Sequence, residues 1–168
     1  FGIGPKPSVI LLCLKQFQTI SLENAAPNHE AFTGLHAHLR QSFPSVFATL
    51  KTETIDGYSL LIEWPGQYPG LEPGLLLAHQ DVVPVQPGTE ADWRYPPFSG
   101  TVAEGHIWGR GTMDFKLGVV GILEAAELLI RAGIKPRRTL FLAFGHDEET
   151  LGQSAQAIVA HLQNRDVR

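Results

Sequence analysis

Three short polar clusters in the sequence carry side chains that could bind a metal ion. The first holds His79 and Asp81, the second ends in Asp114, and the third runs from Asp147 to Glu149. Imidazole and carboxylate groups without a thiolate suit zinc, manganese or cobalt. An acid two residues after a histidine can accept the second ring N–H, which fixes the tautomer that a metal-bound histidine needs. The clusters therefore predict a metal site.

The carboxylates of the second and third clusters could have different roles in such a site, either binding metal or acting as a general base. Asp114 can bridge two metal ions, because each of its oxygens can bind one. Of the adjacent Glu148 and Glu149, one can bind metal while the other stays free as a general base. A simpler reading is open for each cluster alone, since Asp147 or Thr150 could cap the following helix. The ordered set of three clusters favours the metal site.

The elements expected around these clusters place them at one edge of a sheet. The segments 74–81 and 139–144 are typical of buried strands. The first segment ends in the first cluster, and the third cluster follows the second segment. Helices are expected at 116–134, directly after Asp114, and at 152–164. Because sites in open α/β sheets form at the carboxyl ends of the strands, we expect the three clusters to converge there.

The rest of the chain adds one helix and three strands, expected at 27–45, 9–14, 46–55 and 58–64. Asn28 could cap the helix and Pro44 could end it. The turn Asp56-Gly57 predicts a hairpin between the last two strands. The alternation of apolar strands with helices predicts an α/β domain around a mostly parallel sheet.

The composition favours a single globular domain. The 168 residues are 43% hydrophobic and 18% charged, with a net charge of −4, so neither a nucleic acid nor an anionic membrane is an expected partner. The single cysteine, Cys13, excludes an internal disulfide and a cysteine-based zinc cluster. No apolar run has the length of a membrane span, and without a clear signal peptide a cytoplasmic location is favoured.

Four segments form an ordered and specific set: LLLAHQDVVPV (75–85), WRYPPFSG (93–100), IWGRGTMDFK (107–116) and GHDEE (145–149). Together they resemble the aminoacylase and carboxypeptidase S branch of the dinuclear zinc peptidases, over about residues 46 to 160. The resemblance implies a three-layer α/β catalytic domain with helices on both faces of the sheet. It also implies hydrolysis of an amide bond in an N-acyl amino acid or a small peptide. The complete site would hold two zinc ions, for which cobalt or manganese could substitute.

The same resemblance implies a role for each site residue. His79 corresponds to a ligand of one zinc ion, Asp114 to the carboxylate that bridges both ions, and Glu149 to a ligand of the other. Two residues have catalytic roles. Asp81 corresponds to the acid that orients His79. Glu148 corresponds to the general base that takes a proton from the shared water and returns it to the leaving amine.

Two departures from the family pattern shape the expectations. Phe115 follows Asp114, where relatives usually have another acid or a small polar residue, yet the peptide bond between them is still expected to be cis. The family also needs another acidic ligand and a distal histidine, and inserts a lid or dimerisation domain. Residues 1–168 are therefore expected to be the N-terminal part of a catalytic domain, with an incomplete metal set that binds zinc weakly or not at all. The full-length protein is expected to form a homodimer through the missing domain.

Other interpretations stay open at this point. The chain could be a catalytically inactive fragment, or a non-catalytic binding domain of the same fold. A nucleotide-binding domain is disfavoured, because GRGTMD matches neither the G-x-G-x-x-G nor the P-loop pattern. His146 and Asp147 are expected to be structural, and His29, His36 and His38 are expected to be exposed.

Overall fold

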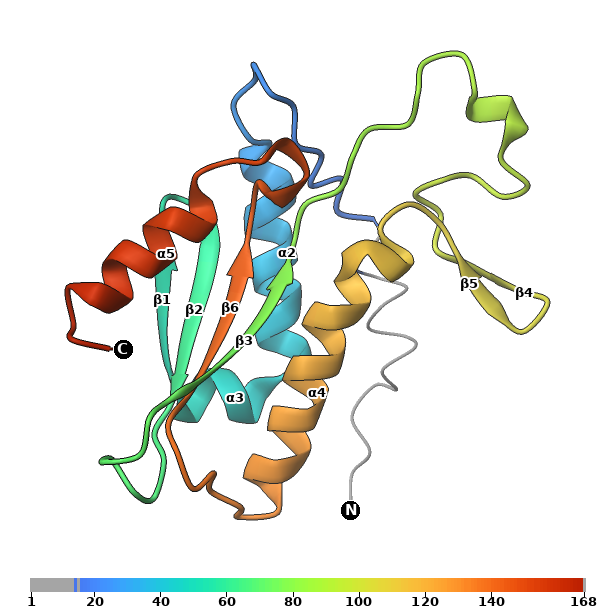
Figure 1. Ribbon diagram of the computed structural model, residues 1–168. Coiled ribbons are helices and arrows are strands. Elements are labelled where there is room, and N and C mark those ends of the chain that lie inside the picture. Colours follow the sequence, from blue (N-terminus) through green and yellow to red (C-terminus); the bar gives the residue numbers. More distant parts are fainter. Residues whose placement is uncertain (1–13, 15, 168) are drawn as a thin grey trace.

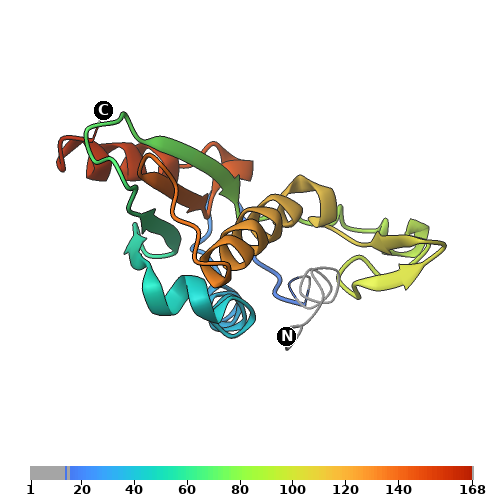
Figure 2. The same cartoon turned by 90° about the horizontal axis from the view of Figure 1, so that it is seen from below.

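The computed structural model describes residue 14 and residues 16–167, and it contains a four-stranded sheet in the order β1–β2–β6–β3 (Figure 1). The strands are β1 (Lys51–Ile55), β2 (Ser59–Trp64), β3 (Gly74–His79) and β6 (Leu140–Gly145). A separate hairpin, β4 (Thr101–Ala103) and β5 (His106–Trp108), projects away from this sheet (Figures 1 and 2).

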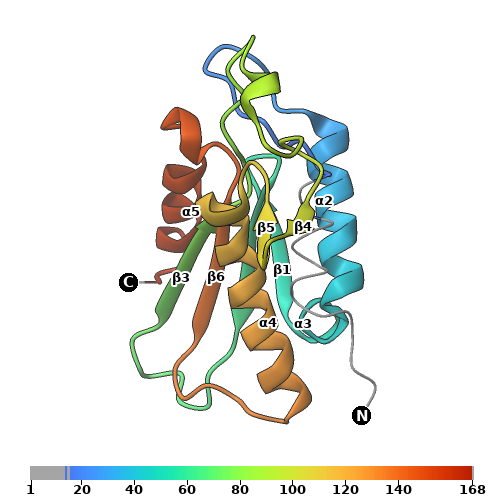
Figure 3. The ribbon, with the colours of Figure 1, turned by 90° about the vertical axis from the view of Figure 1, so that its right-hand side faces the viewer.

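Helices cover both faces of the four-stranded sheet (Figure 3). One face packs against α2 (His29–Ser42), α3 (Pro44–Thr49) and α4 (Leu117–Arg131), and the other against α5 (Ser154–Gln163). Side chains alternate between the two cores, because successive residues of a strand point to opposite faces. Leu60 and Ile62 join the larger core, whereas Leu61 joins the core beneath α5. The three-layer α/β class is confirmed.

The sheet is mixed, so the prediction of a mostly parallel sheet was wrong. Only β3 and β6 run parallel, whereas β1 pairs antiparallel with β2 and β2 pairs antiparallel with β6. The predicted hairpin is the cause: positive φ angles at Asp56 (48°) and Gly57 (84°) reverse the chain between β1 and β2. A central strand covered on both faces is apolar whichever way its neighbour runs, so the apolar pattern alone did not reveal the direction.

Residues 44–49 form the short helix α3, although a strand was expected from 46. Pro44 stands at the start of this helix, where its missing N–H removes no helical hydrogen bond. The buried carboxylate of Glu127, on α4, accepts hydrogen bonds from the backbone N–H groups of Ser45 (3.1 Å) and Val46 (2.9 Å). A distant side chain therefore caps the helix, and only 51–55 remains as the strand β1.

The other helices and strands expected within the described residues are confirmed to within a few residues. Asn28 caps α2 as predicted, because its side chain accepts a hydrogen bond from the backbone N–H of Ala31 at 3.1 Å. The strand expected at 9–14, with Cys13, lies outside the described residues except for the buried Leu14. Among the described helices, none combines the length and the apolar character that crossing a bilayer requires.

Candidate metal centre

The parallel pairing of β3 with β6 brings the first and third polar clusters side by side. In its register His79, the last residue of β3, lies opposite Gly145, the last residue of β6. The backbone N–H of Gln80 then donates to the carbonyl of Gly145 at 2.8 Å, which extends the ladder by one residue. The residues that follow both strands therefore leave the sheet at the same edge.

The three residues predicted as metal ligands meet at this edge. His79, Asp114 and Glu149 each offer one ligand atom, and these atoms all lie within 4.8 Å of one another. The Nε2 atom of His79 is 3.0 Å from Oδ1 of Asp114 and 3.8 Å from Oε2 of Glu148. The ring of His79 is buried, whereas the side chain of Glu148 is 62% exposed. One nitrogen and several carboxylate oxygens are the donor set that zinc accepts, so these residues fit the predicted ion.

Asp81 is buried directly behind the ligands. Its Oδ1 atom and its backbone carbonyl oxygen each lie 3.2 Å from Nδ1 of His79, and its Oδ2 atom accepts the backbone N–H of Glu149 at 3.1 Å. Burial opposes ionisation of Asp81, but the close approach of the His79 ring and the hydrogen bond from the backbone N–H of Glu149 outweigh it and hold the pKa of this carboxyl below its usual value. One carboxylate therefore contacts a predicted ligand from each of two strand ends.

Negative charge accumulates at this edge of the sheet. Burial acts against the charged form of His79, but hydrogen bonds to Asp81 and Asp114 and the charges of Asp81 and Glu148 together raise its pKa to about 9. Burial of Glu149, reinforced by the charge of Asp114, raises the pKa of that carboxyl. A divalent cation would relieve this repulsion, which is a second way in which the residues fit a metal ion.

A tight turn before α4 places Asp114. Gly111 has a φ of +74°, and a Cβ atom at this position would lie only 2.3 Å from Cγ1 of Val82. The turn therefore packs directly against the chain that follows Asp81. The peptide bond between Asp114 and Phe115 is cis, as the resemblance predicted. The ring of Phe115 lies beside His79, with 5.9 Å between the ring centroids.

Sequence reasoning missed the residues that support the end of β3. Gln80 is fully buried, and its amide donates to the backbone carbonyls of Phe144 (2.8 Å) and Tyr58 (3.0 Å). Its Oε1 atom accepts a hydrogen bond from Nε2 of His36 at 2.7 Å. His36 is therefore half-buried, contrary to expectation, and burial lowers its pKa. The only sequence signal for Gln80 is its place between two site residues.

The fold, together with a group of side chains that could bind a metal ion, is typical of the catalytic domain of a metallopeptidase. Residues 75–168, more than half of the chain, match the peptidase family M20/M25/M40. The chain belongs to this family.

Two characterised proteins have sequences similar to this chain. The chain is 41% identical over 155 residues to the N-fatty-acyl-amino acid synthase/hydrolase PM20D1 of Homo sapiens, a match that covers 91% of the chain and 30% of that protein. It is 41% identical over 138 residues to carboxypeptidase S of Saccharomyces cerevisiae, which covers 79% of the chain and 24% of that protein. The chain thus spans less than a third of the length of either relative.

Solved structures share the fold. The M20 family metallo-carboxypeptidase Sso-CP2 from Sulfolobus solfataricus superposes with a TM-score of 0.74 at 20% identity, over 98% of this chain and 36% of that one. Human carnosine dipeptidase 1 superposes with a TM-score of 0.70 at 17% identity, over 95% of this chain and 36% of that one. The described residues therefore have the fold of part of an M20-type catalytic domain.

Proposed function

We propose that the chain carries part of the active site of a metal-dependent hydrolase that cleaves the amide bond of N-acyl amino acids or small peptides. The observation that carries this proposal is the grouping of His79, Asp114 and Glu149 beside the exposed carboxylate of Glu148. Membership of the M20 family supports it, as do relatives that are named as an N-fatty-acyl-amino acid hydrolase and a carboxypeptidase.

In this proposal the metal is zinc, and the chain's own residues hold it. His79, Asp114 and Glu149 would hold the metal, because their ligand atoms lie within 4.8 Å of one another. Bound zinc would polarise the scissile carbonyl and lower the pKa of the attacking water. Asp81 orients both sides of the site, because it contacts the ring of His79 and the backbone of Glu149.

Glu148 is the proposed general base. Its side chain is largely exposed at the mouth of the site, so water can reach it, and its carboxylate faces Nε2 of His79 at 3.8 Å. Glu148 takes a proton from the attacking water as the water adds to the carbonyl. It then delivers that proton to the nitrogen of the leaving amine, so the carboxylate is regenerated.

The three proposed ligands are too few for a complete two-zinc site. Two four-coordinate zinc ions need more ligands than His79, Asp114 and Glu149 can supply. We therefore propose that further ligands come from outside residues 1–168, and that these residues are the N-terminal part of the catalytic domain. The homodimer predicted from the resemblance stays a prediction.

An apolar cavity beside the ligands supports an acyl substituent on the substrate. It has a volume of about 350 Å³ and opens next to His79 and Glu148. Its apolar lining comes from β3, α5 and the turn before α4, through Leu75, Leu77, Phe115, Ile158 and Val159. An apolar acyl chain could be buried in this cavity, away from water, while the amide carbon of the substrate stays beside the metal ligands.

The test is hydrolysis of N-acyl amino acids of increasing acyl length by the protein that carries this chain. We expect activity to disappear when a chelator removes the metal and to return with added zinc. We also expect long acyl chains to be cleaved faster than N-acetyl groups. If the zinc-loaded protein cleaves no N-acyl amino acid and no small peptide, the proposal fails and a non-catalytic binding domain becomes the better account.

A further inference from the structure

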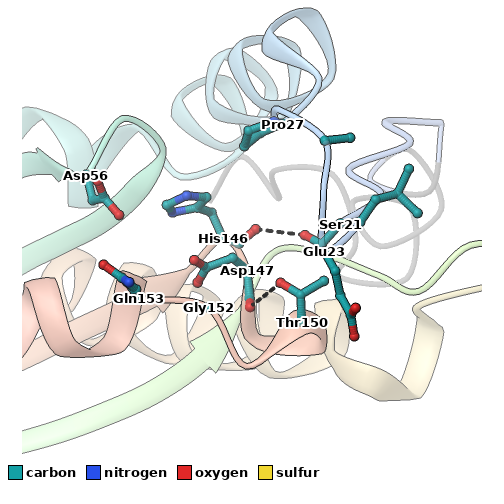
Figure 4. A pocket seen from close by; sticks show the side chains of 11 residues that line it. Ser21, Glu23, Pro27, Asp56, His146, Asp147, Thr150, Gly152 and Gln153 are labelled. Carbon is teal, nitrogen blue, oxygen red and sulfur yellow. Dashed lines mark hydrogen bonds between the residues drawn. The ribbon is translucent and has the colours of Figure 1, made fainter.

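A second group of possible ligands lies outside the proposed active site. Asp56, His146 and Asp147 each offer one ligand atom, and these atoms lie within 4.8 Å of one another. Asp56 is in the turn between β1 and β2, and the other two follow β6. The register that pairs Leu60 with Phe144 brings this turn beside the end of β6. The three residues line an open cavity of about 380 Å³ (Figure 4).

His146 is held in the way that metal-binding histidines are held. It is only 5% exposed, and its Nδ1 atom is hydrogen-bonded to Oγ of Ser59 at 2.8 Å. The rings of Phe32 and Tyr58 contact it edge to face, at centroid distances of 6.0 Å and 5.6 Å. Among the described residues, none forms a hydrogen bond with Nε2. A ring fixed at one nitrogen leaves the other nitrogen available for a ligand.

The two carboxylates face this ring across a gap. Figure 4 shows the side chains of Asp56, His146 and Asp147 directed toward one another. Within the described part of the chain, neither carboxylate comes within 4.0 Å of a ring nitrogen of His146. The gap is too wide for a direct hydrogen bond. Two ligands of a tetrahedral zinc ion lie roughly 3.3–3.5 Å apart, so the side chains would move slightly closer together around an ion.

Asp147 has a structural role that is compatible with binding an ion. Its carboxylate accepts the backbone N–H of Ser154 at 3.1 Å and 3.3 Å, so of the two capping residues that the sequence left open, Asp147 satisfies the first turn of α5. A carboxylate has about four acceptor positions, and this cap leaves others free. Asp56 is exposed and caps no helix, which makes it the better residue to replace in a test.

We propose that Asp56, His146 and Asp147 bind a divalent transition-metal ion, with Zn²⁺ or Mn²⁺ matching their nitrogen and oxygen donors. This site is separate from the proposed catalytic ligands and does not depend on them. The ion would join the β1–β2 turn to the loop that carries Glu148 and Glu149. Its role would then be to fix that loop.

Calorimetric titration with ZnCl₂ tests the site in the 168-residue chain. The starting variant is Asp114→Asn/Glu149→Gln, which removes two proposed catalytic ligands. We expect it to bind one zinc ion, and we expect Asp56→Asn in addition to weaken that binding at least tenfold. Asn adopts positive φ readily, so this change preserves the turn. The control is Glu23→Gln, which lines the same cavity but points away from His146 (Figure 4) and should change the affinity less than twofold.

Line broadening by MnCl₂ in amide spectra of the same variants locates the ion. We expect the amide signals of Gly57 and Asp147 to broaden before that of Gly133, and Asp56→Asn to abolish this preference. The proposal is overturned if the starting variant binds no zinc, if Asp56→Asn leaves the affinity within twofold, or if manganese broadens other parts of the chain first.

Discussion

Asp81 is a single buried carboxylate that serves two ligands of the proposed metal centre. One oxygen faces Nδ1 of His79, and the other accepts the backbone N–H of Glu149. Its pKa is held below the usual value, so it stays ionised under ordinary conditions. A charged acceptor behind a metal-bound histidine makes the ring a stronger ligand and fixes its orientation.

Replacing Asp81 with Asn should weaken zinc binding about 10–100-fold, because the amide has the same shape but lacks the charge. Competition with a chromophoric chelator, in the protein that carries this chain, measures the affinity. Asp92→Asn, at the exposed end of the short 3₁₀ helix Glu90–Asp92, is the matched control and should leave the affinity unchanged. An unaltered affinity for the Asp81 variant would show that this acid does not support the ligands.

The grouping of the proposed ligands, with Asp81 behind them, could be predicted from the sequence, but the more distant supports could not. His79, Asp114 and Glu149 have side chains that bind metals and stand next to strands or helices, so their types and places indicated a common site. Gln80 and His36 carry no such signal. They meet through a hydrogen bond between β3 and α2, which only the packed structure creates.

At the scale of elements, the turn before α4 is built around Gly111. Two separate demands exclude a side chain there: the positive φ of +74°, and the position of Val82, whose Cγ1 atom lies 2.3 Å from the point that a Cβ atom would occupy. Gly105 shares the first demand, with a φ of +77°, but no atom lies within 4 Å of the corresponding point. A substitution at Gly105 therefore tests backbone strain alone, whereas a substitution at Gly111 tests backbone strain and steric overlap together.

Gly105→Ala should lower the free energy of unfolding by about 1–2 kcal/mol, the usual cost of left-handed backbone. Gly111→Ala should lower it by about 1–3 kcal/mol more, because the new methyl group overlaps Val82. Urea unfolding followed by tryptophan fluorescence measures both. A cycle with Val82→Ala should show coupling with Gly111→Ala, and equal losses for the two glycine variants would contradict the steric account.

Most helices and strands could be predicted from local patterns, and the errors have non-local causes. The helix α3 forms where a strand was expected because Glu127, on α4, caps its first turn. The direction of β2 relative to β6 depends on how the hairpin docks, which the apolar pattern of β6 does not encode. The local sequence indicates which segments form helices or strands. Which strands pair, and in which direction, depends on how those segments pack together.

At the scale of the whole molecule, β3 leaves an apolar edge open. Among the described strands β3 pairs only with β6, and Leu75, Leu76 and Leu77 along it are 43%, 43% and 61% exposed. An exposed apolar strand with one unpaired edge is a template for association with another chain.

The 168-residue chain should therefore self-associate, and Leu77→Lys should shift it toward the monomer, because a charged edge resists pairing. Light scattering over a range of protein concentrations measures the mass. Leu128→Lys, on the exposed side of α4 where this residue is 56% exposed, is the control and should not shift it. A monomer of the unaltered chain at high concentration would refute the prediction.

The central claim is that Glu148 transfers protons at a metal centre held by its neighbours. The most direct measurement is kcat for an N-acyl amino acid with Glu148→Gln, together with the zinc content of the same sample, in the protein that carries this chain. We expect kcat to fall by about 10²–10⁴-fold while bound zinc stays unchanged. Glu124→Gln, on α4, should retain full activity. Unchanged kcat in a zinc-loaded Glu148→Gln variant would contradict the account.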